Sequence, residues 1–89
     1  MEFEWDEAKR RINLIKHGID FIDAELLFDG RPVCTIRSVF PNEERYLTTG
    51  IIEDHVVTVV WTQRGERLRL ISARRARDAE RRAYRALYQ

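Results

Sequence analysis

The sequence predicts an α+β fold, in which two N-terminal helices precede an antiparallel β-sheet and a C-terminal helix. Two segments before residue 29 each combine a capping aspartate with apolar residues at helical spacing. From residue 33 the pattern changes to short apolar or alternating stretches divided by turn residues, and a helical pattern returns near the C-terminus. The 89 residues are expected to form a single domain, residues 1–89, with a limited core.

The N-terminal third is predicted to contain a short strand and two helices. Residues 2–5 alternate polar and apolar side chains, which fits a strand. Asp6 caps the first helix, and Gly18 ends it in the left-handed conformation. The apolar stripe of this helix comprises Ala8, Ile12 and Ile15. Asp20 caps the second helix, residues 21–28. The buried side of that helix comprises Phe21, Ala24, Leu27 and Phe28.

Four strands are expected after a turn at residues 29–32. They cover residues 33–39, 45–52, 56–62 and 67–73. The third is almost continuously apolar, as expected for a central strand covered on both faces. The fourth follows a hairpin turn at residues 63–66 and alternates strictly. One of its faces comprises Leu68, Leu70 and Ser72, and the other comprises Arg67, Arg69 and Ile71. A last helix, capped by Asp78, runs from residue 79 to the end of the chain.

The two parts of the chain differ strongly in charge. Residues 1–63 carry 7 basic and 12 acidic side chains, whereas residues 64–89 carry 9 basic and 3 acidic ones, for a net charge of +1. The basic excess near the C-terminus predicts a polyanionic partner. An acidic protein partner and a solvated helix face are the alternatives.

Composition and motifs argue against several classes of function. No apolar run approaches the ~20 residues that cross a bilayer, and the N-terminus is unlike a secretory signal, so no membrane association is expected. Cys34 is the only cysteine, which favours a cytoplasmic protein without an internal disulfide. His17 and His55 have no further histidine beside them, so neither a metal nor a cofactor is predicted. Phosphate loops and nucleophile elbows are absent from the sequence.

The remaining polar residues suit the cleavage of RNA without a metal. That reaction needs a base for the 2′-hydroxyl proton, an acid for the departing 5′-oxygen and cations beside the phosphate. Arginine suits the last role because its planar fork matches two phosphate oxygens. We therefore expect the C-terminal guanidinium groups to converge on a surface that binds a phosphodiester.

Three linked segments resemble the BrnT family of bacterial toxins. They read "FEWDEAKRRINLIKHGIDFIDAELLF" at 3–28, "ERYLTTG" at 44–50 and "RLRLISARRARDAERRAYR" at 67–85. The resemblance implies a RelE-like fold and the toxin role in a type II toxin–antitoxin system, that is, a ribonuclease that cuts RNA and inhibits growth. It also implies a cognate ribbon-helix-helix (BrnA-like) antitoxin, a 2:2 heterotetramer, and contact with promoter DNA through the antitoxin.

The family motifs also mark candidate catalytic residues. These are Lys16, His17, Arg64, Arg74, Arg75, Glu80, Arg81 and Tyr84. Arg74, Arg75 and Arg81 are expected to hold the scissile phosphate, while His17 or Lys16 assists proton transfer. Tyr84 or Glu80 would complete the site. A structural role is the alternative for Glu80 and Tyr84, which share a helix face, and for Lys16 and His17, whose charge suits a helix C-terminus.

Four other positions are assigned to structure. Asp6, Lys9 and Asn13 match the family as well, but their spacing suits capping and packing better than catalysis. His55 is expected in a turn that the family does not fix, and we expect it to lie outside the site.

Two other functions fit the same sequence. The chain could be a binding module whose basic helix docks nucleic acid or an acidic protein without cutting RNA. It could also be a degenerate toxin that acts only as a co-repressor with its antitoxin. Purified protein would leave RNA intact in both cases.

Overall fold

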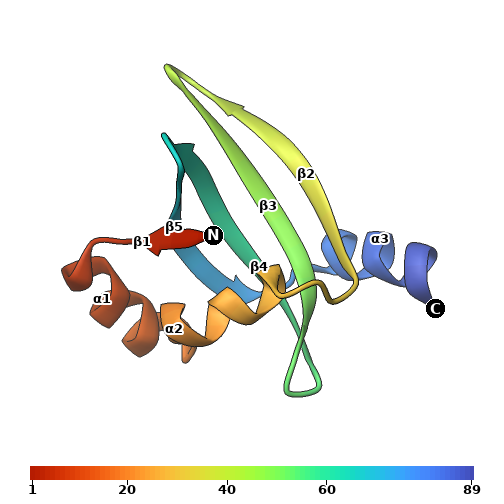
Figure 1. Ribbon diagram of the computed structural model, residues 1–89. Helices are drawn as coiled ribbons and strands as arrows, with labels where there is room; N and C mark the ends of the chain where they lie inside the picture. The colour runs from red at the N-terminus through yellow and green to blue at the C-terminus, as the bar shows by residue number, and fades with distance from the viewer.

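The chain folds into a five-stranded sheet with helices on both faces (Figure 1). The computed structural model describes residues 1–89, apart from the side chains of residues 39 and 40. Its helices are α1 (Glu7–His17), α2 (Phe21–Ala24) and α3 (Asp78–Tyr88), and a 3₁₀ turn, η1 (Glu25–Phe28), continues α2. Its strands are β1 (Glu2–Glu4), β2 (Val33–Phe40), β3 (Glu43–Ile52), β4 (His55–Arg64) and β5 (Arg67–Arg75). Among the described helices, none is long and apolar enough to span a bilayer.

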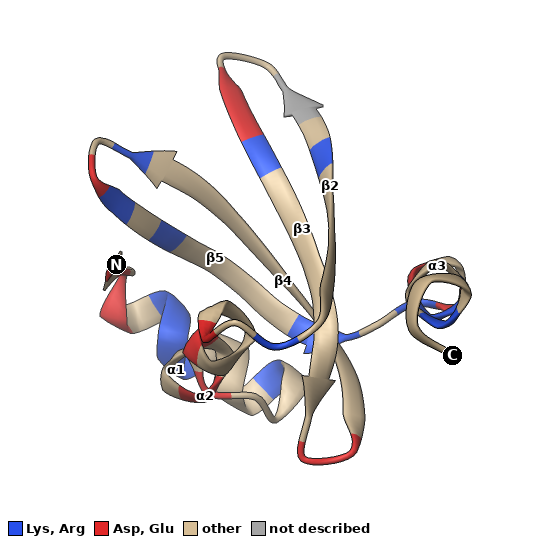
Figure 2. Ribbon diagram, turned by 45° about the vertical axis from the view of Figure 1, so that its right-hand side comes forward, with Lys and Arg blue, Asp and Glu red and all other residues tan. Residues whose placement is uncertain are grey.

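The sheet has the order β1-β5-β4-β3-β2, so β4 is central, as predicted. Strands β2 to β5 pair in antiparallel fashion through successive hairpins, whereas β1 pairs in parallel with β5. The α1, α2 and η1 segments cover one face, and α3 lies against the other face at one end (Figure 2). These features confirm the α+β class and the C-terminal helix.

The hydrophobic core fills the space between the sheet and the layer of α1, α2 and η1. Its buried members are Phe21, Ala24, Leu27, Ile52, Val57, Val59, Leu68, Leu70 and Ala73. The predicted buried side of the second helix is therefore confirmed, with Phe28 half-buried at the edge of the core. Leu68 and Leu70 also take their predicted places, because alternation along β5 points both side chains to this face.

Three of the four predicted helix signals are confirmed. The Asp6 carboxylate accepts the Ala8 N–H at 2.9 Å, and the Asp20 carboxylate accepts the Ile22 N–H at 3.0 Å. Gly18 ends α1 with φ of 71°. The fourth, Asp78 as cap of α3, is wrong. Asp78 is the first helical residue and Arg77 is the N-cap; the Glu80 carboxylate reaches back to accept the Arg77 N–H at 2.8 Å.

Helix α1 uses a polar residue to pack against the sheet. Its predicted apolar stripe faces outward, with Ile12 61% and Ile15 87% exposed, and the buried residue of the helix is Asn13. The Asn13 side-chain amide donates to the carbonyl of Ala73 at 2.9 Å and accepts the Ala73 N–H at 3.2 Å. The amide thus pairs with the open edge of β5 as a neighbouring strand would. This confirms a packing role for Asn13.

A β-bulge interrupts β5. Trp61 of β4 pairs with Leu70, but the next residue, Val60, pairs with Ser72, so Ile71 is an extra residue. The strict alternation predicted for residues 67–73 is therefore wrong beyond Leu70, and Ser72 does not share the face of Leu70. The bulge reverses the side on which every later residue of the strand points.

Candidate functional site

A cavity of about 290 Å³ opens where α1 meets the β3–β4 hairpin. Its polar lining comes from His17, Asp23, Glu53, His55 and Arg75, and its apolar lining includes Ile52 and Val57. The cavity combines two imidazoles, two carboxylates and a guanidinium. These are groups that can exchange protons and bind an anionic ligand.

His17 and His55 reach this cavity from elements far apart in the sequence. His17 is the last residue of α1, and the left-handed Gly18 turns the chain away directly after it. His55 is the first residue of β4 and pairs with Ile52 across a tight turn. That turn requires φ of 48° at Glu53 and 66° at Asp54. His55 is thus the first residue of a strand and not part of the expected turn, and it lines the same cavity as His17.

Arg75 enters the same cavity because of the bulge. It pairs with Val57 at the end of β5, and paired residues of neighbouring strands point to the same face. That face also carries His55, two residues from Val57 along β4. Arg75 is exposed, and no described carboxylate lies within ion-pair distance of it. Its guanidinium is therefore available to a ligand.

Arg74 points to the opposite face, where it is paired. Its guanidinium donates to both carboxylate oxygens of Glu80, at 2.8 and 3.0 Å, and both side chains are below 15% exposed. Glu80 also accepts the Thr58 hydroxyl at 2.9 Å, and Thr58 contacts the Thr49 hydroxyl at 2.7 Å. Burial disfavours the charged carboxylate, but the hydrogen bonds from Arg74, the Arg77 N–H and Thr58 outweigh it and lower the pKa of Glu80 to about 2.

The hydrogen-bonding capacity of this Arg74–Glu80 pair is thus used within the fold. The pair joins the end of β5 to the first turn of α3, and Thr58 attaches both to the central strand. A carboxylate with such a low pKa is a poor proton donor or acceptor near neutral pH. The geometry therefore favours the structural alternative for Glu80.

The other candidates lie away from the cavity. Arg64 is at the far tip of the sheet, 4.0 Å from Glu43, where it lines a different hollow. Arg81 pairs with Asp78 on α3 at 3.2 Å. Tyr84 is buried, and its hydroxyl lies 3.4 Å from the carbonyl oxygen of Pro32.

The expected convergence of the C-terminal arginines is wrong. Figure 2 shows the basic residues spread over α1, the sheet and α3. Of the eight candidates, His17 and Arg75 share the cavity, and Lys16 lines an adjoining hollow that also includes His17. Three polar lining residues were not among the candidates from the sequence: Asp23, Glu53 and His55. The sequence did offer a signal for these residues. The short turn between the second and third predicted strands lies at the same end of the sheet as the last residues of β5.

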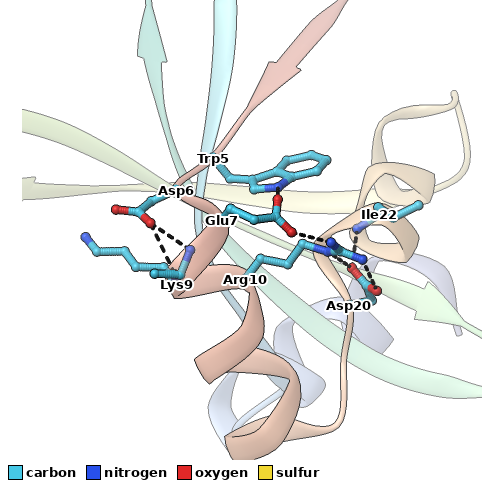
Figure 3. A network of polar contacts seen from close by, with 8 residues as sticks. Trp5, Asp6, Glu7, Lys9, Arg10, Asp20 and Ile22 are labelled. Carbon is cyan, nitrogen blue, oxygen red and sulfur yellow. Dashed lines mark hydrogen bonds and ion pairs between the residues drawn. The ribbon is translucent and has the colours of Figure 1, made fainter.

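A polar network holds α1 and α2 together beside the cavity (Figure 3). Arg10 donates to both oxygens of Asp20, at 2.8 and 3.0 Å, and also contacts Glu7. Glu7 in turn accepts the Trp5 indole N–H at 3.1 Å. The hydrogen bonds from Arg10 and the Ile22 N–H lower the pKa of Asp20. These contacts fix the angle between the helices that carry His17 and Asp23.

Metal-binding groups do not gather in the described part of the chain. No three histidine, cysteine or carboxylate residues among the described side chains are arranged to hold a metal ion.

Comparison with known proteins identifies the family. A search of curated proteins finds no match. Residues 5–80 match the family model described as the ribonuclease toxin BrnT of type II toxin–antitoxin systems. That range contains every lining residue of the cavity, and it covers most of the 89 residues. The chain belongs to the BrnT family of ribonuclease toxins of type II toxin–antitoxin systems.

Proposed function

We propose that this toxin is a metal-independent RNA endonuclease whose cleavage site is the cavity between His17, His55 and Arg75. The observation that carries the proposal is the meeting of two imidazoles and an unpaired guanidinium in one cavity. The family supplies the ribonuclease activity. We further propose that the sheet and its helices form a RelE-like fold, on the resemblance noted above.

The cavity residues suit a transesterification. The 2′-oxygen attacks the adjacent phosphorus as one imidazole removes its proton, and the 5′-oxygen leaves with a proton from the other imidazole. The products are a 2′,3′-cyclic phosphate and a free 5′-hydroxyl. Arg75 binds the phosphate oxygens and stabilises the charge that develops on them. The carboxylates of Asp23 and Glu53, which are able to accept hydrogen bonds, line the cavity where they would orient an imidazole or a base edge.

The remaining candidates take supporting places in this proposal. Arg74 and Glu80 hold the end of β5 against α3, so they position Arg75 through the backbone. Tyr84 anchors α3 near Pro32. Arg64 and Arg81 lie too far along the fold to contact a phosphate in the cavity, so we assign them no role in the chemistry.

We propose that the neutralising partner is a ribbon-helix-helix antitoxin. It would form a 2:2 heterotetramer with the toxin and carry the complex to its own promoter DNA. The type II family implies an antitoxin and an RNA substrate, and both fit a cytoplasmic toxin. An antitoxin that covers the cavity would leave the complex unable to cut RNA.

Incubation of purified toxin with RNA in EDTA tests the cleavage site. The wild type should cut and leave a cyclic phosphate end. His17→Ala and His55→Ala should each lower kcat by roughly 10²–10⁴-fold, as expected for loss of a general acid or base. Arg75→Ala should also lower kcat.

Arg64→Ala is the matched control for Arg75, because it removes an exposed arginine at the far tip of the sheet. It should cut at the wild-type rate. Full activity of both histidine variants would place the chemistry elsewhere. Intact RNA with the wild type would favour the non-catalytic functions.

A further inference from the structure

A second hollow lies on the other side of His17. It encloses about 180 Å³ between α1 and the bulged part of β5, and His17 lines both spaces. Its lining includes Lys9, Ile12, Lys16, Ile71 and Ser72. A ligand chain that occupies the first cavity can therefore continue past His17 into this hollow.

Both lysines of the chain line this hollow. The sequence contains no lysine other than Lys9 and Lys16. They are seven residues apart on α1, which places them on one face at a separation of about 10 Å. Both are exposed, and neither forms an ion pair with a described carboxylate. In Figure 3 the Lys9 side chain extends away from the Arg10–Asp20 pair. The hollow thus presents two unpaired positive charges, about as far apart as separate phosphates of one strand.

Two apolar side chains line the hollow beside the buried Asn13. Ile12 is 61% exposed although it lies on a helix packed against the sheet, and the bulge residue Ile71 is half-buried beside it. Apolar side chains of this kind pack against the faces of unstacked bases. The Ser72 hydroxyl at the rim can donate or accept a hydrogen bond with a base edge.

We propose that this hollow is a subsite for single-stranded RNA, which binds a nucleotide flanking the scissile phosphodiester. Lys9 and Lys16 bind the flanking phosphates, and Ile12 and Ile71 contact the base. The proposal rests on cleavage beside His17. The RNA substrate is then unpaired over several nucleotides, because a base must leave its stack to contact Ile12 and Ile71.

Kinetics with two substrates test the subsite. A dinucleoside monophosphate has only the scissile phosphate, whereas a single-stranded RNA of about ten nucleotides also fills the flanking positions. Lys9→Ala should raise KM for the longer RNA by about threefold to tenfold and leave the dinucleotide kinetics unchanged. The salt dependence of binding should also become shallower, by about 0.7 in the logarithmic slope. Arg11→Ala is the matched control, because it removes one positive charge from the opposite side of α1. It should leave KM unchanged for both substrates.

Binding of a 2′-deoxy oligonucleotide of the same sequence separates this proposal from the proposed cleavage. That oligonucleotide lacks the nucleophilic hydroxyl, so weaker binding by Lys9→Ala supports the subsite even if the toxin cuts neither RNA. The subsite would be excluded if Lys9→Ala and Arg11→Ala weakened binding equally, or if Lys9→Ala impaired both substrates alike. It would also be excluded if Lys9→Ala weakened only the complex with the antitoxin, because the hollow would then be a protein contact.

Discussion

Substitution of Glu80 by glutamine removes the charge at the centre of the network on the α3 face while it preserves the size of the side chain. The carboxyl titrates at about 2 in the folded chain, against an ordinary value of 4.5. That difference corresponds to about 3 kcal/mol of unfolding free energy. Both partners of the ion pair are below 15% exposed, so solvent screening reduces this figure little.

The sign of the pH dependence follows from the lowered pKa of Glu80. A carboxyl with a lowered pKa stabilises the fold fully above its unfolded value of 4.5, and this stabilisation is lost as the pH falls from 4.5 to about 2. Urea denaturation at several pH values measures it. Wild type should exceed Glu80→Gln by about 3 kcal/mol at pH 7, and the gap should close toward pH 2.

Glu66→Gln is the matched control for this substitution. Glu66 is exposed in the β4–β5 turn and has no ion-pair partner among the described residues, so its substitution should leave stability unchanged at every pH. The structural role of Glu80 would be refuted if Glu80→Gln were as stable as wild type at pH 7 and yet failed to cleave RNA. In that case the carboxylate would act in the chemistry.

Three further substitutions probe how the site is held, each by denaturation at neutral pH unless stated. Asn13→Leu leaves the N–H and C=O of Ala73 without partners, so it should lower the free energy of unfolding by about 3 kcal/mol. An unchanged denaturation midpoint would mean that water takes over the hydrogen bonds of the amide. Gly50→Ala places a Cβ 2.8 Å from Cδ2 of Leu27 and should cost about 1–3 kcal/mol, whereas a neutral result would show that Leu27 moves freely. Asp20→Asn keeps the helix cap but removes the charge that faces Arg10. The substitution should therefore lower the free energy of unfolding by about 1 kcal/mol at pH 7. The difference from wild type should shrink as the pH falls below the ordinary pKa of 3.8 and vanish only below the lowered pKa of the folded chain, so a loss independent of pH would contradict an ionic origin.

The elements of this fold follow from local signals. Asp6, Asp20 and Gly18 specify helix ends through their own side chains or backbone freedom, so their roles are visible in a few consecutive residues. The strands are likewise separated by short turns. Some predicted and observed boundaries differ by about two residues. At the β4–β5 hairpin, β4 runs to Arg64 and not to residue 62, whereas β5 begins at Arg67 as predicted.

The features that were missed depend on pairing between distant segments. Nothing near Ile71 in the sequence shows that β5 gains a residue against β4, since the bulge is a property of both strands together. Asn13 faces the sheet because the edge of β5 needs hydrogen-bond partners, a need that is invisible from α1 alone. For the same reason a helical stripe at Ile12 and Ile15 predicted burial on the wrong face.

The candidate site was the least predictable part. The sequence included His17 among the candidates, and His17 lines the cavity, but it grouped adjacent arginines together because they share a motif. Spatial grouping instead follows from strand register, which brings His55 and Arg75 to one face through their neighbour and partner Val57. The basic excess suggested a cluster of arginines that binds an anion, but most arginines in the described part of the chain form ion pairs within the fold.

Arg74 and Arg75 point to opposite faces because they are consecutive in a strand, and the bulge determines which of the two faces the cavity. Arg74 forms an ion pair with Glu80 inside the fold, and Arg75 lines the open cavity. Alanine at position 74 should therefore act mainly on the stability of the fold, whereas alanine at position 75 should act mainly on the rate of RNA cleavage. Ile71 is the residue that has no partner on β4, so its deletion would leave Arg74 opposite Thr58 and Arg75 opposite Val57, and each arginine would keep its face of the sheet.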